Sequence, residues 1–134
     1  MPLARQAMHE SAEEIHIACW PTVRDMYLVA SRHYAFEGRC FVLAAGSITA
    51  ARDLPRDLEL PPEMQAKPDS LVCAGGSCII APDGTLLAGP VFDREEILVA
   101  DLDLGTIVEE SMALDVTGHY SRPDVFQFSK RVVK

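Results

Sequence analysis

Cys19 and Trp20, in the stretch HIACWPT at residues 16–22, are the residues whose types first suggest chemistry. A cysteine thiolate can attack an electrophilic carbon, and a neighbouring aromatic ring can form the wall of a pocket. A reactive thiolate needs a cationic neighbour or a helix N-terminus, and the sequence places neither beside Cys19. His16 lies three residues earlier on a predicted strand, so its side chain is expected on the opposite face. Cys19 is therefore predicted to be a strand residue rather than a nucleophile.

A second candidate pair is His33 and Glu37, which lie four residues apart on a predicted helix and could act as acid and base. The same spacing is found on many helix faces, which favours an architectural role. A Cys-His hydrolase that combines Cys19 with His16 or His33 is therefore the least favoured hypothesis.

The other three cysteines, Cys40, Cys73 and Cys78, lie in or beside apolar runs and are predicted to be core thiols. No two of the chain's cysteines form a C-x-x-C pair, and no two histidines have ligand spacing. The sequence therefore predicts neither a metal site nor a cofactor.

Length and composition indicate a single globular domain. The chain has 134 residues, of which 49% are hydrophobic and 24% charged. Its net charge of −8 and the absence of a basic cluster argue against nucleic acid or an anionic membrane as partner. The N-terminus has no signal-peptide pattern, and no apolar run approaches the roughly 20 residues of a membrane span. A cytoplasmic protein with reduced thiols is expected.

Hydrophobic periodicity and turn residues predict a series of alternating helices and strands. One stripe of the second helix carries Met26, Val29, Ala30, His33 and Glu37, and Gly38 is its expected C-cap. The last helix is expected to turn Ile107, Val108 and Met112 inward. In order, the expected elements are a helix from Pro2, a strand at 15–20, a helix at 24–38, a strand at 39–46, a proline-rich exposed loop at 51–70, a hairpin turning at 82–84, a strand at 95–103, a helix at 104–115 and an extended tail.

This order is typical of an α/β (α+β) fold with a mixed sheet, two main helices and an extended C-terminal tail. The strands are apolar on both faces, whereas only the two main helices are available to cover them. Strands of this composition are normally covered on both sides. The sequence therefore predicts part of a larger domain.

Three segments, "MPLARQAM", "RHYAFEGRCFVLAAG" and the long run from "GGSCIIAPDG" to "GHYSRPDVF", resemble the nitrilase branch of the carbon-nitrogen hydrolase family. The similarity covers nearly the whole chain and departs mainly at 52–69. It implies half of a nitrilase-type α-β-β-α sandwich. Residues 1–105 would be the C-terminal half of the hydrolase domain, and residues 106–134 a C-terminal helix and oligomerisation tail.

The resemblance also implies a mechanism in which a cysteine attacks the nitrile, a glutamate acts as general base and a lysine stabilises the tetrahedral species. In the family the nucleophile lies in a Cys-Trp-Glu segment a few residues before the Met-Pro-Leu that matches Met1-Pro2-Leu3. The chain is thus expected to hold no catalytic residue and to be inactive alone. Trp20 and Pro21 are the expected substrate-pocket residues, although Trp20 could equally serve only in packing.

Two partner hypotheses remain, the first from the resemblance and the second from the surplus of apolar strand surface over helical cover. In the first, a small nitrile is the substrate only when the upstream half of the domain is supplied. In the second, the chain is a non-catalytic remnant that associates with itself or with full-length nitrilase subunits. The tail segment "RPDVFQF" has the alternation of an edge strand, which fits an oligomer contact; the alternative is a frayed chain end.

Overall fold

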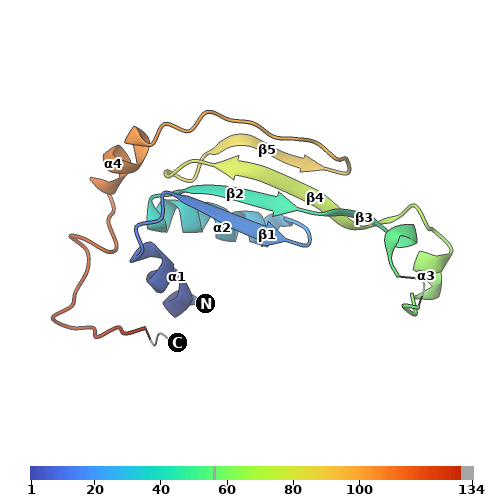
Figure 1. The fold of residues 1–134 in the computed structure, drawn as a ribbon, viewed down its shortest axis with the longest axis horizontal. Helices are drawn as coiled ribbons and strands as arrows, with labels where there is room; N and C mark the ends of the chain where they lie inside the picture. Colours follow the sequence, from blue (N-terminus) through green and yellow to red (C-terminus); the bar gives the residue numbers. More distant parts are fainter. Residues whose placement is uncertain (56, 131–134) are drawn as a thin grey trace.

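The computed structural model describes residues 1–55 and 57–130 as a mixed five-stranded sheet with the two longest helices on one face (Figure 1). Strand β1 is parallel to β2, and the other pairings are antiparallel. The strand order is β1-β2-β4-β3, with β5 pairing β4. This confirms the predicted fold class. The elements are α1 (Pro2–His9), β1 (Ile15–Trp20), α2 (Asp25–Gly38), β2 (Phe41–Gly46), β3 (Ile48–Ala50), the 3-10 turn η1 (Ala51–Asp53), α3 (Pro62–Gln65), β4 (Leu71–Ile80), β5 (Leu86–Phe92) and α4 (Gly105–Ser111).

The central unit is β1-α2-β2, a crossover that joins two parallel strands through a helix. Gly38, the predicted C-cap of helix α2, is instead the last residue of the helix. Its C-cap is Arg39, which has a left-handed φ of 49°. A non-glycine residue is strained there, and the buried contacts of the Arg39 side chain offset that strain.

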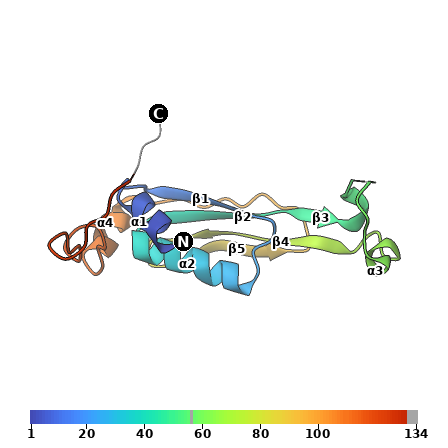
Figure 2. The ribbon, with the colours of Figure 1, turned by 90° about the horizontal axis from the view of Figure 1, so that it is seen from below.

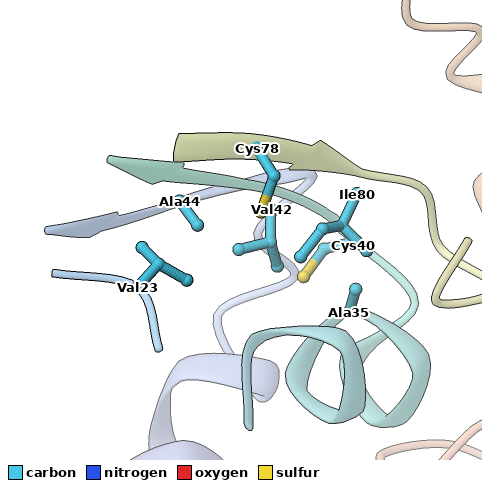
Figure 3. Close-up of a cluster of buried hydrophobic side chains, with 7 residues drawn as sticks. All are labelled: Val23, Ala35, Cys40, Val42, Ala44, Cys78 and Ile80. Atoms are coloured by element: carbon cyan, nitrogen blue, oxygen red, sulfur yellow. The ribbon is translucent and has the colours of Figure 1, made fainter. Parts of the chain in front are cut away.

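The core lies between α2 and the sheet (Figure 3). The helix turns Ser31 and Ala35 toward the strands, whereas Met26 and Val29 are 74% and 55% exposed. The apolar stripe noted in the sequence thus faces away from the sheet. The buried residues of this cluster are Val23, Ala35, Cys40, Val42, Ala44, Cys78 and Ile80.

The proline-rich segment forms an arm that projects from one end of the sheet (Figures 1 and 2). Its predicted exposure is largely confirmed, but the expectation of a plain loop is wrong. The short strand β3 pairs with the first residues of β4, and the arm also contains η1 and α3. Pro62 is the first residue of α3, a position where the missing amide N–H costs nothing.

The predicted hairpin is confirmed as β4-β5, with Gly84 at a φ of +83° in its turn. The strand predicted at 95–103 is wrong, because this segment pairs with none of the strands among residues 1–55 and 57–130. The last helix, α4, is shorter than predicted and leaves Val108 and Met112 70% and 85% exposed, against the expectation that they face inward. The described part of the tail, 116–130, contains no strand.

Candidate functional site

Ligands of open α/β sheets bind at the carboxyl ends of parallel strands. A site is therefore expected where the parallel strands β1 and β2 end. Trp20 and Gly46 are the last residues of the two strands and lie opposite each other in the ladder. The Ser47 N–H donates to the Pro21 carbonyl at 3.1 Å, which joins the two loops that follow the strands. Two consecutive loops are thus fixed side by side at one edge of the sheet.

Strand β4 holds the loop after β1 from the other side. The Val23 N–H donates to the Gly75 carbonyl at 2.7 Å, and the Ala74 N–H donates to Thr22 Oγ1 at 2.8 Å. Gly76 has a φ of +89°, and a Cβ there would lie 2.3 Å from the Val23 carbonyl oxygen. Only glycine permits this close approach of two backbones.

A cavity of about 190 Å³ lies beside these loops. The Ser77 hydroxyl, which lines it, donates to the Gly46 carbonyl and accepts the Gly46 N–H at 3.0 Å. Arg94 and Glu96, which pair at 2.6 Å, also line this cavity. A serine hydrogen-bonded only to backbone has no general base, so the described residues provide no activated nucleophile in this cavity.

The two predicted pocket residues occupy different environments. The Trp20 indole lies toward α2, where its N–H donates to Ser31 Oγ at 3.3 Å and its ring centroid is 4.8 Å from that of Tyr27. Pro21 is exposed on the loop after β1. Neither residue lines the cavity beside Ser77. Trp20 therefore has a packing role in this chain, and a pocket role for the two residues stays a prediction.

Cys19 is exposed on the sheet face opposite Trp20 and has no hydrogen-bond partner among the described residues. His16 lies on the α2 side, where Nδ1 is 3.1 Å from a Glu13 carboxylate oxygen and its ring stacks 4.0 Å from that of Tyr34. The two side chains leave β1 in opposite directions. The Cys-His hydrolase that pairs Cys19 with His16 is excluded by this geometry.

Glu37 belongs to a polar cluster where α1 meets α2, rather than to an acid-base pair with His33. One carboxylate oxygen of Glu37 is 2.6 Å from Arg5 Nε and 3.3 Å from His9 Nε2. His33 Nδ1 is 4.0 Å away on a half-exposed side chain. This supports the architectural interpretation, because Glu37 attaches α1 to α2.

The same cluster continues through Glu13, which accepts a hydrogen bond from the Tyr34 hydroxyl. Burial, together with this hydrogen bond, raises the pKa of Tyr34 above its ordinary range. His9 Nδ1 is buried without a hydrogen-bond partner among the described residues. The sequence did not predict this cluster, because its members come from three separate segments of the chain. Only their charges indicated that they could pair.

The buried cysteines are inert thiols. Burial raises the pKa of Cys40 to about 12 and also raises the pKa of Cys78. Both were predicted to be core residues and are confirmed as such, whereas Cys73 is only half-buried. Within residues 1–55 and 57–130 no group of three or more His, Cys, Asp or Glu side chains could hold a metal ion. The helices of that part of the chain also lack the length and apolar character to cross a membrane.

Comparison with known proteins identifies the family to which this chain belongs. A family model described as carbon-nitrogen hydrolase matches residues 1–110. A bifunctional nitrilase/nitrile hydratase of Lupinus angustifolius is 45% identical over 128 residues, covering 93% of this chain and 37% of the relative. An arylacetonitrilase of Trametes versicolor is 41% identical over 133 residues, covering 98% of this chain and 41% of the relative.

Solved structures agree with this assignment at the level of the fold. A carbon-nitrogen hydrolase of Helicobacter pylori G27 superposes with a TM-score of 0.67 at 21% identity, covering 93% of this chain and 43% of that one. A carbon-nitrogen hydrolase superfamily protein of Xanthomonas campestris gives 0.58 at 17% identity, covering 88% and 37%.

The chain belongs to the carbon-nitrogen hydrolase family. Within that family its relatives place it in the nitrilase branch. It spans about two fifths of the length of the curated relatives that it matches. The match to the family model crosses residue 105, so the division of the chain at that point stays a prediction.

Proposed function

We propose that this chain is the later part of a nitrilase-type domain and that nitrile hydrolysis requires a complementary part carrying the catalytic cysteine, glutamate and lysine. In that domain the chain contributes the loops at the carboxyl ends of β1 and β2. Taken alone it does not hydrolyse nitriles. Its reaction in the completed domain is attack of the cysteine on the nitrile carbon, followed by hydrolysis to the carboxylic acid and ammonia.

The observation that carries this proposal is the placement of α1. Helix α1 lies on the same face of the sheet as α2 and runs back toward the amino end of β1 (Figure 1). Strand β1 is an edge strand of the described sheet. A right-handed crossover through α1 would set a preceding parallel strand against this open edge, with its carboxyl end beside Trp20 and Pro21. A nucleophile just before α1 would then lie next to the two predicted pocket residues.

The chemistry of the described residues supports the same conclusion. Cys19 has no basic partner, Cys40 and Cys78 stay protonated, and Ser77 bonds only to the backbone. We also place the protein in the cytoplasm, because all four cysteines are free and Cys19 is exposed.

The test asks whether the 134-residue chain hydrolyses nitriles by itself. Ammonia release from an aliphatic nitrile and from phenylacetonitrile is measured for the pure chain and for its Cys19→Ala variant. We expect no release from either. Ammonia release by the pure chain that Cys19→Ala abolishes would overturn the proposal, as would an upstream coding sequence that lacks an in-frame Cys-Trp-Glu.

A second candidate function is a non-catalytic module that associates with itself or with nitrilase subunits. It is favoured by the apolar side chains left uncovered on β1, where Ile15 and Ile17 are 43% and 67% exposed. Sedimentation and dye binding discriminate the two candidates. A monodisperse monomer that binds no apolar dye would exclude this module.

A further inference from the structure

Helix α1 packs on the rest of the chain through one buried residue, His9. No other residue of the helix is buried, and Leu3 and Met8 are 67% and 42% exposed. Isolated helices of fewer than about 12 residues are marginal in water, and α1 has eight residues. The stability of α1 therefore depends on its contact with α2, beside whose last turns it lies in Figures 1 and 2.

Three residues of the last turn of α2 contact the His9 ring. Tyr34, Glu37 and Gly38 are three and four residues apart, which places them on one side of the helix. The centres of the His9 and Tyr34 rings are 4.6 Å apart, and His9 Nε2 lies 3.3 Å from Glu37 Oε2. A carboxylate only accepts hydrogen bonds, so the His9 ring donates from Nε2. The ring thus has both a packing contact and a directional hydrogen bond.

Gly38 provides the space that the His9 ring occupies. A Cβ at Gly38 would lie 2.4 Å from His9 Nδ1 and 2.5 Å from His9 Cε1, well inside contact distance. Glycine is less favourable than alanine within a helix, and Gly38 is not among the residues with a positive φ. The absence of a side chain at residue 38 is therefore explained by the approach of His9.

The His9 ring is buried at a cost. Its Nδ1 atom has no hydrogen-bond partner among the described residues, and the nearer Glu13 carboxylate oxygen is 4.0 Å away. An apolar ring would avoid this cost, whereas it could not bond to Glu37. Fixed polar contacts of this kind specify one orientation of the elements that they join.

We propose that His9 is a positioning residue: its ring, packed over Gly38 and hydrogen-bonded to Glu37, fixes α1 on α2 and thereby the segment that leads into Met1. The inference rests on the proposed function, which places the nucleophile in that segment, and adds the residue that sets the nucleophile's position. A displacement of about 1 Å can lower a rate about a hundredfold, so the His9 contact controls kcat.

The first experiment measures amide hydrogen exchange in the 134-residue chain. We expect His9→Ala to speed exchange at residues 5–9 at least about tenfold, because α1 loses the contact that keeps it folded. Met8→Ala truncates an exposed side chain of the same helix and should change these rates by less than about threefold. The amides of β2, Phe41–Gly46, report whether the sheet is folded.

Three results of this experiment would overturn the inference. One is an equal effect of His9→Ala and Met8→Ala at residues 5–9. Another is exchange at 5–9 in the parent chain that is already as fast as in an unfolded chain. The third is a loss of β2 protection in His9→Ala, because the effect of that variant would then be global.

A second experiment tests the contact between the two residues. Gly38→Ala should speed exchange at residues 5–9 at least about tenfold in the parent chain, because its methyl group clashes with the His9 ring. In His9→Ala the ring is absent, so the addition of Gly38→Ala should change the rates by less than about threefold. The same change in both backgrounds would overturn the inference, because the two residues would then act independently.

A third experiment measures kcat and KM for phenylacetonitrile in a single-chain chimera. This complete chain replaces the matched segment of the Trametes versicolor arylacetonitrilase, and kcat is taken per molecule with a protected β2. We expect His9→Ala to lower kcat at least about tenfold and to change KM by less than about twofold, because the nucleophile is displaced while substrate binding is retained. Met8→Ala should leave both constants unchanged.

The chimera also separates this inference from the proposed function. An active chimera that keeps its kcat after His9→Ala would overturn the inference and leave the proposed function standing. An inactive parent chimera in which residues 5–9 are protected only when His9 is present would support the inference and count against the proposed function.

Discussion

Replacing Arg39 by alanine should destabilise the chain more than replacing any other Arg, Lys, Asp or Glu of the described residues, because Arg39 is the only one of these that is buried. The Arg39 side chain is 4% exposed and donates to the Pro82 carbonyl and to the Leu114 carbonyl, each at 3.1 Å. It also lies 3.3 Å from Glu110 and 4.2 Å from the centre of the Phe36 ring. One side chain thus connects α2, the β4-β5 turn and α4.

The loss of stability in Arg39→Ala can be estimated from each contact that the Arg39 side chain makes. An acceptor that stays buried without a donor costs about 1–3 kcal/mol, which applies to the Pro82 carbonyl. Glu110 is one-third exposed and regains water, so its ion pair contributes about 1 kcal/mol at most. Stacking over a half-exposed Phe36 adds about 0.5–1 kcal/mol. We therefore expect Arg39→Ala to lower the free energy of unfolding by about 1.5–5 kcal/mol.

A glycine variant separates the side chain from the backbone. Arg39→Gly loses the same contacts but relieves the left-handed φ of 49°, a strain of about 1–2 kcal/mol for other residues. It should be about 1 kcal/mol more stable than Arg39→Ala. Arg52→Ala, which removes an exposed ion pair to Asp69 on the arm, is the matched control and should change stability by less than about 0.5 kcal/mol.

The assay is urea unfolding followed by far-ultraviolet circular dichroism and by the fluorescence of Trp20, the only tryptophan. Hydrogen exchange in α4 adds a local readout, because Glu110 lies in that helix and Leu114 just after it. The reasoning is refuted if Arg39→Ala lies within about 0.5 kcal/mol of the parent, or if the glycine variant is the less stable of the two.

Three further predictions concern the glycines and the thiols. Gly76→Ala should destabilise by more than about 2 kcal/mol in urea unfolding, because of its φ of +89° and a 2.3 Å backbone contact, whereas Gly105→Ala should be tolerated. With a thiol reagent at pH 8, exposed Cys19 should react in the native chain, and Cys40 and Cys78 only after urea is added; equal rates would contradict their burial. Because the folded pKa of Cys40 is raised to about 12, its contribution to stability is complete below about pH 9 and is lost as the pH rises toward 12. Cys40→Ala should flatten this loss, and an unchanged pH profile of unfolding would refute the assignment.

The parts of the fold that depend on local sequence were predicted well. The strand at 15–20, the helix ending at Gly38 and the strand leading to Gly46 form a unit whose contacts are close in sequence. The hairpin followed from Pro82-Asp83-Gly84, since Gly84 accepts the φ of +83° that its turn requires. Periodicity and turn residues carry this information directly.

Other features depend on contacts that no local pattern contains. Arg39 caps α2 because Pro82 and Leu114, more than forty residues away, accept its hydrogen bonds. Helix α2 packs on the sheet through a side that includes the polar Ser31. The more apolar stripe through Met26 and Val29 is exposed. The pocket role of Trp20 stays a prediction, because it depends on the complementary part that we propose and no local pattern in this chain can establish it.

The wrong prediction of a strand at 95–103 has the same physical origin as the open edge of β1. Alternation in sequence records which face of a segment is buried in the complete domain, whereas strand assignment needs hydrogen bonds to a neighbour. Residues 95–102 have the alternation and lack the neighbour. On the face covered by α2, the helix and the strands bury a core that includes Val42 and Ile80. The prediction therefore failed on the face of the sheet that α2 leaves open, where the described residues offer this segment no neighbouring strand.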